Sequence, residues 1–245
     1  MISLTSKDFI KEGDFLIYKI EKITLVFSTA ERDRSFNRHI ECGVDNLDSI
    51  KNDFELEDII YINQIHSDKT YIYNKECKNI RDKEGDALIT NEKNVAIGVF
   101  TADCVPVIII NEKSNVIATI HSGWKGTFNS ITLETLLKMK KEFNIDINET
   151  KVFIGPHIRK CCYEVSEELK MNFLEKTKME ERILFDDRKL SLEDCILKDL
   201  EEVGIRDSNI YSLNLCTYCE NNIKLYSYRK SVGTYGRLFS FAFIK

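Results

Sequence analysis

The chain has 245 residues, 43% of them hydrophobic and 31% charged, so it can bury a full core as one large domain or two closely joined halves. Its net charge of −5 argues against a nucleic acid or an anionic membrane surface as a partner. The first residues lack a signal-peptide apolar region and no apolar run is long enough to span a bilayer. The eight cysteines are therefore expected as reduced thiols in the cytoplasm, not as a disulfide framework.

The N-terminal part of the chain is predicted to begin with strands. Residues 8–28 contain two apolar, β-branched runs separated by a Glu-Gly-Asp turn, which predicts edge strands. Residues 29–40 are highly charged and have no clear period, so a loop is expected there. Apolar residues at helical spacing then predict a helix over residues 45–58.

Strand-like segments dominate residues 59–121. The apolar, β-branched run 95–110 is interrupted by Thr101-Ala102-Asp103-Cys104, which predicts two strands joined at a polar break. Residues 59–73 alternate around a second irregular break. Residues 83–90 are predicted to form a turn that enters a short strand.

The second half of the chain mixes helices with strands. Helices are predicted over residues 127–143 and 166–178, with a strand over 151–155 between them. A capping box at Ser191 opens another helix, which Gly204 is expected to end. Because strands and helices do not alternate regularly, an α+β fold with mixed sheets is expected rather than a doubly wound sheet.

Three residues of metal-binding type stand at strand ends or breaks, namely His66, Cys104 and His121. Two imidazoles and one thiolate suit Zn²⁺ or copper. Three protein ligands leave one coordination position open, as expected of a catalytic metal. The residues alone favour the alternative of two surface histidines and one buried free cysteine.

A C-x-x-C motif, Cys216-Thr217-Tyr218-Cys219, lies near the C-terminal end of the sequence. This spacing is typical of a redox pair or of half of a zinc site. No second C-x-x-C exists to complete four ligands, which favours an ordinary pair of free thiols.

Several segments taken together resemble one family. In the family's order, they are residues 63–66 (Asn-Gln-Ile-His), 85–90 (Gly-Asp-Ala-Leu-Ile-Thr), 101–107 (Thr-Ala-Asp-Cys-Val-Pro-Val), 121–126 (His-Ser-Gly-Trp-Lys-Gly), 154–156 (Ile-Gly-Pro), 161–165 (Cys-Cys-Tyr-Glu-Val), 216–218 (Cys-Thr-Tyr), 227–229 (Ser-Tyr-Arg) and 236–237 (Gly-Arg). The chain thus resembles, from about residue 59 to its end, the laccase-domain family. Its members are known as polyphenol-oxidase-like multicopper proteins, as peptidoglycan editing factor and as purine nucleoside phosphorylases.

The resemblance implies a fold of two mixed sheets sandwiched by helices, here a single domain over residues 1–245. The family's metal ligands correspond to His66, Cys104 and His121, which would hold zinc and form the catalytic centre. The implied activities are phosphorolysis of adenosine, inosine and methylthioadenosine, which is a transferase reaction, and hydrolytic deamination of adenosine. The implied partners are a purine nucleoside and phosphate, with the oligomeric state left open.

Four further residues are predicted to contact the substrates. The strand, tight turn and helix start over residues 121–128 suit an anion, so Lys125 is expected to bind phosphate, with Arg229 as a second cation. Alternatively, Lys125 is a solvated turn residue and Arg229 pairs with a carboxylate at a sheet edge. Asn63 and Gln64 are expected either to bind a base edge or to cap strand ends.

Two other functions compete with the nucleoside enzyme. A copper-dependent polyphenol oxidoreductase needs a histidine-rich set of copper sites, which four histidines cannot build. A cell-wall (peptidoglycan) quality-control protein would use the metal only structurally. The chain also departs from the family near its start, where Ser28-Thr29 is not followed by the usual Gly-rich segment, and at His157, expected to be an extra pocket group or an exposed residue.

Overall fold

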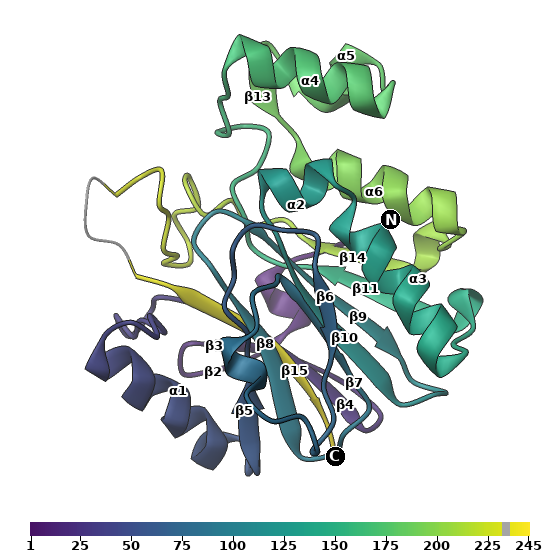
Figure 1. The fold of residues 1–245 in the computed structure, drawn as a ribbon. Coiled ribbons are helices and arrows are strands. Elements are labelled where there is room, and N and C mark those ends of the chain that lie inside the picture. The colour runs from purple at the N-terminus through teal and green to yellow at the C-terminus, as the bar shows by residue number, and fades with distance from the viewer. Residues whose placement is uncertain (232–235) are drawn as a thin grey trace.

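Two β-sheets packed face to face form the centre of the protein (Figure 1). The structure is a computed structural model that describes residues 1–231 and 236–245. In spatial order, the seven-stranded sheet consists of β1 (Ile2–Leu4), β14 (Ile210–Leu213), β11 (Thr150–Ile154), β9 (Val105–Asn111), β10 (Val116–Ser122), β7 (Ala87–Thr90) and β6 (Thr70–Ile72). The six-stranded sheet consists of β2 (Ile10–Glu12), β3 (Phe15–Ile20), β4 (Ile23–Ser28), β15 (Leu238–Ile244), β8 (Val95–Thr101) and β5 (Asp58–Ile60). Each sheet contains both parallel and antiparallel pairs.

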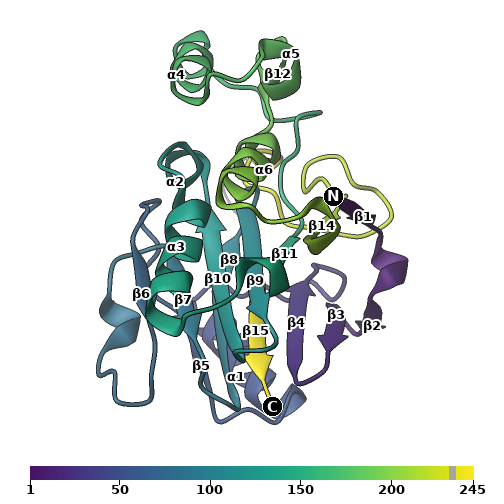
Figure 2. The ribbon, with the colours of Figure 1, turned by 90° about the vertical axis from the view of Figure 1, so that its right-hand side faces the viewer.

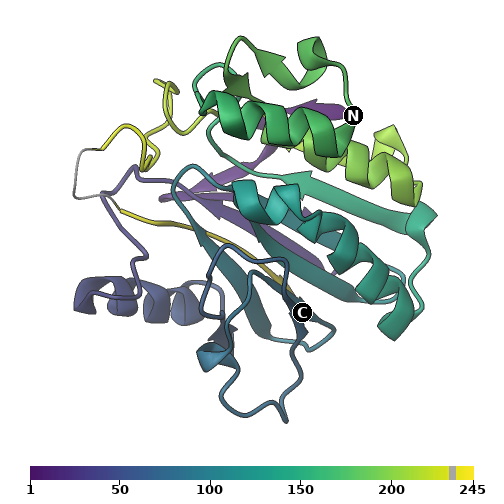
Figure 3. The same cartoon turned by 45° about the horizontal axis from the view of Figure 1, so that its top comes forward.

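Helices cover the outer faces of the two sheets. They are α1 (Glu41–Asp53), α2 (Trp124–Phe128), α3 (Ile131–Phe143), α4 (Glu167–Thr177), α5 (Glu181–Leu184) and α6 (Leu192–Val203). The helices α3 and α6 contact each other over the seven-stranded sheet, and α1 packs beside β5 of the other sheet (Figure 2). The helices α4 and α5 are followed by a short hairpin of β12 (Phe185–Asp186) and β13 (Lys189–Leu190). Together these elements form a unit that lies away from α1 (Figures 1 and 3).

The side-chain alternation of the strands explains these layers. In β9, Val107 and Ile109 belong to the core beneath α3 and α6, whereas Ile108 and Ile110 belong to the core between the two sheets. Because successive strand residues face opposite sides, a strand that is apolar throughout must be covered on both faces. The continuous apolar run in this segment therefore reads as an interior strand of a helix–sheet–sheet–helix stack, and the expected α+β fold with mixed sheets is confirmed.

The chain crosses from the six-stranded to the seven-stranded sheet at the two breaks predicted from the sequence. The run 95–110 forms β8 and β9 as expected, but these strands lie in different sheets. Residues 59–73 likewise include β5 in one sheet and β6 in the other. Both crossings contain a predicted metal ligand, so these breaks determine where the site forms.

Two predicted helices have different bounds in the structure. The helix expected over 45–58 runs from Glu41 to Asp53, because Phe54 caps its end and packs on Phe15 and Phe241 instead. The helix expected over 127–143 is two helices, α2 and α3.

The break between α2 and α3 lies at Ser130, which adopts a left-handed conformation with φ of 58° and donates its hydroxyl to Asp199 of α6. By contrast, the capping of α6 follows the sequence. Ser191 Oγ accepts the backbone N–H of Asp194 at 3.1 Å, and Gly204 ends the helix with φ of 87°.

The expectation of edge strands over residues 8–28 is only partly right. The edge strand β2 lies there, but β4 pairs with β3 on one side and with β15 on the other. All six residues of β4 are buried, because the pairing with β15 covers the edge that an N-terminal hairpin would leave open.

All eight cysteines are free thiols in the structure. Within the described residues, no helix combines the length and the apolar character that a membrane span requires.

Candidate metal and substrate site

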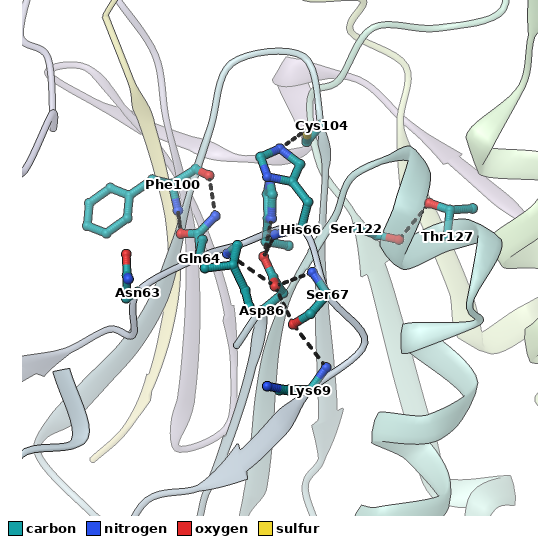
Figure 4. A network of polar contacts seen from close by, with 12 residues as sticks. Asn63, Gln64, His66, Ser67, Lys69, Asp86, Phe100, Cys104, Ser122 and Thr127 are labelled. Carbon is teal, nitrogen blue, oxygen red and sulfur yellow. Dashed lines mark hydrogen bonds and ion pairs between the residues drawn. The ribbon is translucent and has the colours of Figure 1, made fainter. Parts of the chain in front are cut away.

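The three predicted metal ligands meet at one end of the two sheets. His66 lies in the crossing from β5 to β6, Cys104 lies in the crossing from β8 to β9, and His121 lies near the end of β10. One ligand atom from each side chain lies within 4.8 Å of the other two. The two crossings and the end of β10 thus bring together residues that are far apart in the sequence. His66 and Cys104 are 38 positions apart, and Cys104 and His121 are 17 positions apart; Figure 4 shows the first pair.

The spacing of the ligand atoms suits a four-coordinate ion. His66 Nε2 is 3.9 Å from Cys104 Sγ, and the two imidazole rings have centroids 4.8 Å apart at 80°. Ordinary Zn–N and Zn–S bonds in a tetrahedral site separate a nitrogen from a sulfur by about 3.6 Å. His121 is buried and Cys104 is half-buried, whereas His66 is exposed. One side of the ligand set is therefore open to solvent.

The carboxylate of Asp86 holds two of the ligands in place. Asp86 is fully buried, and its Oδ1 is 2.8 Å from Nδ1 of His121 and accepts the backbone N–H of His66 at 3.0 Å. Its Oδ2 accepts the backbone N–H of Ser67 at 2.5 Å and the Ser67 hydroxyl at 2.7 Å (Figure 4). A carboxylate that binds the second nitrogen of a ligand histidine fixes the ring orientation and leaves the other nitrogen for a metal. Sequence reasoning missed this role, although an aspartate directly before a buried apolar strand was a usable signal.

Charge accumulates at these residues in a pattern that suits a cation. Burial raises the pKa of a thiol, but His121 and His66 outweigh burial and hold the pKa of Cys104 at about 6. Burial lowers the pKa of an imidazole, but the Cys104 thiolate and Asp86 outweigh it and raise the pKa of His121 to about 9. Burial also raises the pKa of Asp86, and the bond and charge of His121 reverse this, so its pKa is lowered. A thiolate and a carboxylate therefore flank one extra positive charge, which a metal ion can replace.

Gly123 makes room for the ligands. A Cβ atom added there would lie 2.8 Å from Cδ2 of His66 and 3.1 Å from Sγ of Cys104. The backbone of Gly123, with φ of −74° and ψ of 174°, is open to any residue, so close approach and not conformation requires the glycine. The types of the three ligands, the spacing of their ligand atoms and the space that Gly123 leaves beside them together fit a bound metal ion.

Asp103 directs Cys104 into the site but does not itself face it with a free carboxylate. Asp103 has φ of 95°, a conformation that is rare for residues other than glycine. Its Oδ1 accepts the Thr217 hydroxyl at 2.6 Å and its Oδ2 accepts the backbone N–H of Arg229 at 2.7 Å. Both carboxylate oxygens of Asp103 are therefore engaged by these neighbours.

A cavity of about 580 Å³ opens onto the ligands. Its lining combines aromatic side chains with several cations and includes Arg38, Phe100, Trp124, Tyr163, Arg229 and Arg237. The volume lies within the range of small-molecule sites. The aromatic rings and the arginine side chains together suit an aromatic, anionic or hydrogen-bonding ligand.

The charged loop over residues 29–40 contributes Asn37, Arg38 and His39 to the cavity. Sequence reasoning treated this segment as a loop without a site residue. Arg38 lies 5.0 Å above the ring of Phe100 and donates to Asn63 Oδ1 at 3.0 Å. The cluster of arginines in this loop was the signal that could have indicated an anion-binding role.

The predicted substrate residues separate into two groups. Gln64 and Arg229 line the cavity, whereas Asn63 and Lys125 are not among its lining residues. Gln64 Nε2 donates to the carbonyl of Phe100 and its Oε1 accepts the N–H of the same residue, both at 2.8 Å (Figure 4). This pairing anchors the loop that carries His66 to β8, which is the capping role rather than the base-binding role.

Lys125 lies on the surface beside the site. Its ammonium group is 5.6 Å from the centre of the Trp124 ring. The helix α2 that contains both residues has only five residues, so it offers less of an anion site than the long helix predicted from the sequence. His157 is neither exposed nor in the cavity, because it is buried and its Nδ1 bonds to the carbonyl of Gly155 at 2.8 Å.

Comparison with known proteins identifies the family. The model of one protein family, described as multi-copper polyphenol oxidoreductase laccase, matches residues 37–245. The chain belongs to this family. A purine nucleoside phosphorylase from Clostridium acetobutylicum is 42% identical over 227 residues, covering 93% of this chain and 94% of the relative. A second purine nucleoside phosphorylase, from Borreliella burgdorferi, is 36% identical over 175 residues, covering 70% of this chain and 74% of the relative.

Solved structures share the fold of this laccase-family chain. The hypothetical protein YfiH of Bacillus licheniformis has a TM-score of 0.87 at 21% identity and covers 96% of this chain and 98% of its own. YlmD of Geobacillus stearothermophilus has a TM-score of 0.86 at 21% identity, covering 97% and 99%. The helix–sheet–sheet–helix stack is thus a fold that distant sequences share.

Proposed function

We propose that this protein is a zinc-dependent purine nucleoside phosphorylase and that residues 1–245 act as one domain. Relatives named purine nucleoside phosphorylase match most of the chain, one of them over 93% of it. The observation that carries the proposal is a single cavity of about 580 Å³ where a three-ligand site adjoins arginine and aromatic side chains. Phosphorolysis brings a multiply charged anion and a flat base to the same ribose, so a cavity that combines cations with aromatic side chains suits it.

Zinc is the proposed ion, held by His66, Cys104 and His121. A mixed imidazole and thiolate set suits zinc, which when bound would supply Lewis-acid polarisation of an oxygen in an open coordination position. Asp86 engages Nδ1 of His121, so the other ring nitrogen is the one available to the ion. Gln64 ties the loop carrying His66 to β8, which orients that ligand.

The cavity residues are proposed to bind the two substrates. Phe100, Trp124 and Tyr163 offer ring faces and edges to a purine, and Arg38 and Arg229 offer charge to phosphate. Burial, together with the Cys104 charge, raises the pKa of Tyr163 to about 12, so its hydroxyl stays protonated and can donate to a substrate.

In the proposed reaction, a phosphate oxygen attacks C1′ of the ribose and the bond from C1′ to the purine nitrogen breaks. The base leaves with the bonding electron pair and gains a proton, and ribose 1-phosphate is the other product. Adenosine, inosine and methylthioadenosine are the proposed substrates.

Deamination of adenosine, in which water replaces the amino group at C6 and ammonia leaves, is proposed as a second activity of the same cavity. It needs the base pocket and the ion but no phosphate. Inosine formed from adenosine in phosphate-free buffer would therefore be its signature.

The test is a panel of nucleosides incubated with and without phosphate, with products separated by chromatography. Free base and ribose 1-phosphate should form only when phosphate is present. Base release without phosphate would indicate a hydrolase and would contradict the proposal. Oxidation of phenols by the copper-loaded protein would instead support the polyphenol oxidoreductase.

The two predicted phosphate contacts can be separated by mutation. Arg229→Ala should raise the KM for phosphate by about tenfold to a hundredfold, because loss of a charge-assisted contact costs about 1.5–3 kcal/mol. Lys125→Ala tests the alternative, since Lys125 lies on the surface outside the cavity lining. A larger effect of Lys125→Ala than of Arg229→Ala would move the phosphate site to the turn before α2.

The family's description favours a copper oxidoreductase as the second candidate. The two groups of potential metal ligands found among the described residues contain only two histidines, His66 and His121. An electron-transfer copper site and a separate oxygen-reducing cluster need more imidazoles than these. A purely structural metal, as in a cell-wall quality-control protein, is less compatible with a ligand set that opens onto a cavity.

A further inference from the structure

A second cluster of metal-binding side chains lies outside the site described above. It consists of four thiols, those of Cys161, Cys162, Cys216 and Cys219, whose sulfur atoms all lie within 4.8 Å of one another. The sequence contains one C-x-x-C and lacks a second. The structure supplies the missing half with two adjacent cysteines from a segment more than 50 residues earlier.

Two turns bring the four sulfur atoms together. The turn at Cys161 and Cys162 is closed by the N–H of Cys162 donating to the carbonyl of Arg159 at 2.8 Å. The turn that spans Cys216 and Cys219 is closed by the N–H of Glu220 donating to the carbonyl of Cys216 at 3.0 Å. Each turn contributes two of the four sulfur atoms that lie within 4.8 Å of one another.

The spacing of the sulfur atoms is that of a metal site and not of a disulfide. Cys161 Sγ and Cys219 Sγ are 3.7 Å apart. A disulfide bond is about 2.05 Å long. Four sulfurs at the ordinary Zn–S distance in a tetrahedron are about 3.8 Å apart, which matches the observed separation.

The cluster is open to an incoming ion. Cys161 and Cys219 are exposed, so an ion can reach the cluster from solvent.

We infer that Cys161, Cys162, Cys216 and Cys219 form a closed tetrathiolate site for one zinc ion, separate from the His66, Cys104 and His121 site. Four sulfur ligands leave no open coordination position, which is the arrangement of a structural zinc. Binding replaces the thiol protons with the ion and changes no oxidation state.

The proposed ion joins two segments, one of which lines the substrate cavity while the other contacts a lining residue. Tyr163 follows the first pair of cysteines and lines the cavity. Thr217 lies within the second pair and donates to Asp103, the residue before the metal ligand Cys104. Backbone bonds already connect the segments, since the N–H of Thr217 donates to the carbonyl of His157 at 3.0 Å. The tetrathiolate site therefore acts as a cross-link behind the cavity.

Elemental analysis of the tag-free, full-length protein tests the inference. The wild type should contain about two zinc ions per chain, and Cys219→Ser should contain about one. Cys104→Ser should also contain about one, because it removes the other site. Cys42→Ser is the matched control: Cys42 is exposed but belongs to neither cluster, so that variant should keep both ions.

Cobalt substitution distinguishes the two sites without relying on activity. The wild type offers five thiolates to cobalt, four from one site and one from the other. Thiolate-to-cobalt charge-transfer absorption should therefore fall to about one fifth in Cys219→Ser and stay near four fifths in Cys104→Ser. Cys219→His keeps a four-ligand set of sulfur and nitrogen and should restore the second metal ion.

Two results would overturn the inference. One is a Cys104→Ser variant that binds no zinc, which is decisive even if Cys219→Ser fails to fold, because Cys104→Ser leaves all four cysteines of the cluster in place. The other is thiol titration of anaerobically prepared, metal-free protein showing that the four cysteines are paired as disulfides. Hydrogen exchange provides an independent readout, because the amide of Thr217 should exchange faster in Cys219→Ser and unchanged in Cys42→Ser.

Discussion

A methyl group added at Gly123 should displace the metal ligands without unfolding the protein. In Gly123→Ala the new Cβ would lie 2.8 Å from His66 and 3.1 Å from the Cys104 sulfur, so at least one of them must move. His66 is exposed and can turn away, and the backbone at this position accepts alanine. We therefore expect metal affinity to fall by about 10- to 100-fold, or about 1.4–2.8 kcal/mol, as is typical when the support of a ligand is disturbed.

The measurement is a metal competition titration against a chromophoric chelator, combined with thermal unfolding of the metal-free protein. Gly204→Ala is the control, since a Cβ there meets nothing within 4 Å but the φ of 87° strains any residue other than glycine. That variant should lose about 1 kcal/mol of stability and keep its metal affinity. If Gly123→Ala bound metal as tightly as the wild type, the close approach of this glycine to the ligands would not be what requires it.

Two further substitutions test buried carboxylates. Asp86→Asn should weaken metal binding by about 10- to 100-fold in the same titration. The reason is that the amide cannot accept every hydrogen bond that the carboxylate accepts from His121 and Ser67. Unchanged affinity would contradict the role of Asp86 in positioning the ligands. Burial raises the pKa of Asp199 to about 6, so the native state binds more protons than the unfolded state and stability falls as pH rises from about 4 to 6. Asp199→Asn should therefore be more stable than the wild type by about 1–3 kcal/mol in urea unfolding at pH 7.5, with a smaller gain at pH 4. An equal gain at both pH values would mean that the charge of Asp199 is not what destabilises the wild type.

The parts of the fold that could be predicted are those that depend on local chemistry. The Ser191 cap and the Gly204 stop of α6 follow from side-chain and backbone preferences within a few residues. The two strands around Thr101–Cys104 follow from β-branched runs with a polar break. Which sheet each strand joins does not follow, because residues 95–101 and 105–111 are almost equally apolar and either sheet could bury them.

In the candidate site, too, some residues could be predicted from the local sequence and others only from the tertiary structure. His66, Cys104 and His121 could be chosen because their side-chain types are rare and stand at irregular breaks. Asp86 was missed because its partners come from two other segments, and only the tertiary structure brings them together.

The four-thiol cluster could not be predicted for a related reason. Its halves are separated by a hairpin, three helices and a strand, and sequence spacing cannot indicate that they meet. The adjacent cysteines of one half also match no compact metal motif.

The position of β15 has a consequence for folding during synthesis. This strand lies between β4 and β8, yet it is the last strand of its sheet to leave the ribosome. Until then the sheet exists as two halves with unpaired inner edges, and such edges pair readily with other chains. The strand β8 leads directly into the crossing that carries Cys104, so the ligand set takes its final form only after β15 is inserted. Metal loading should therefore follow the synthesis and insertion of β15.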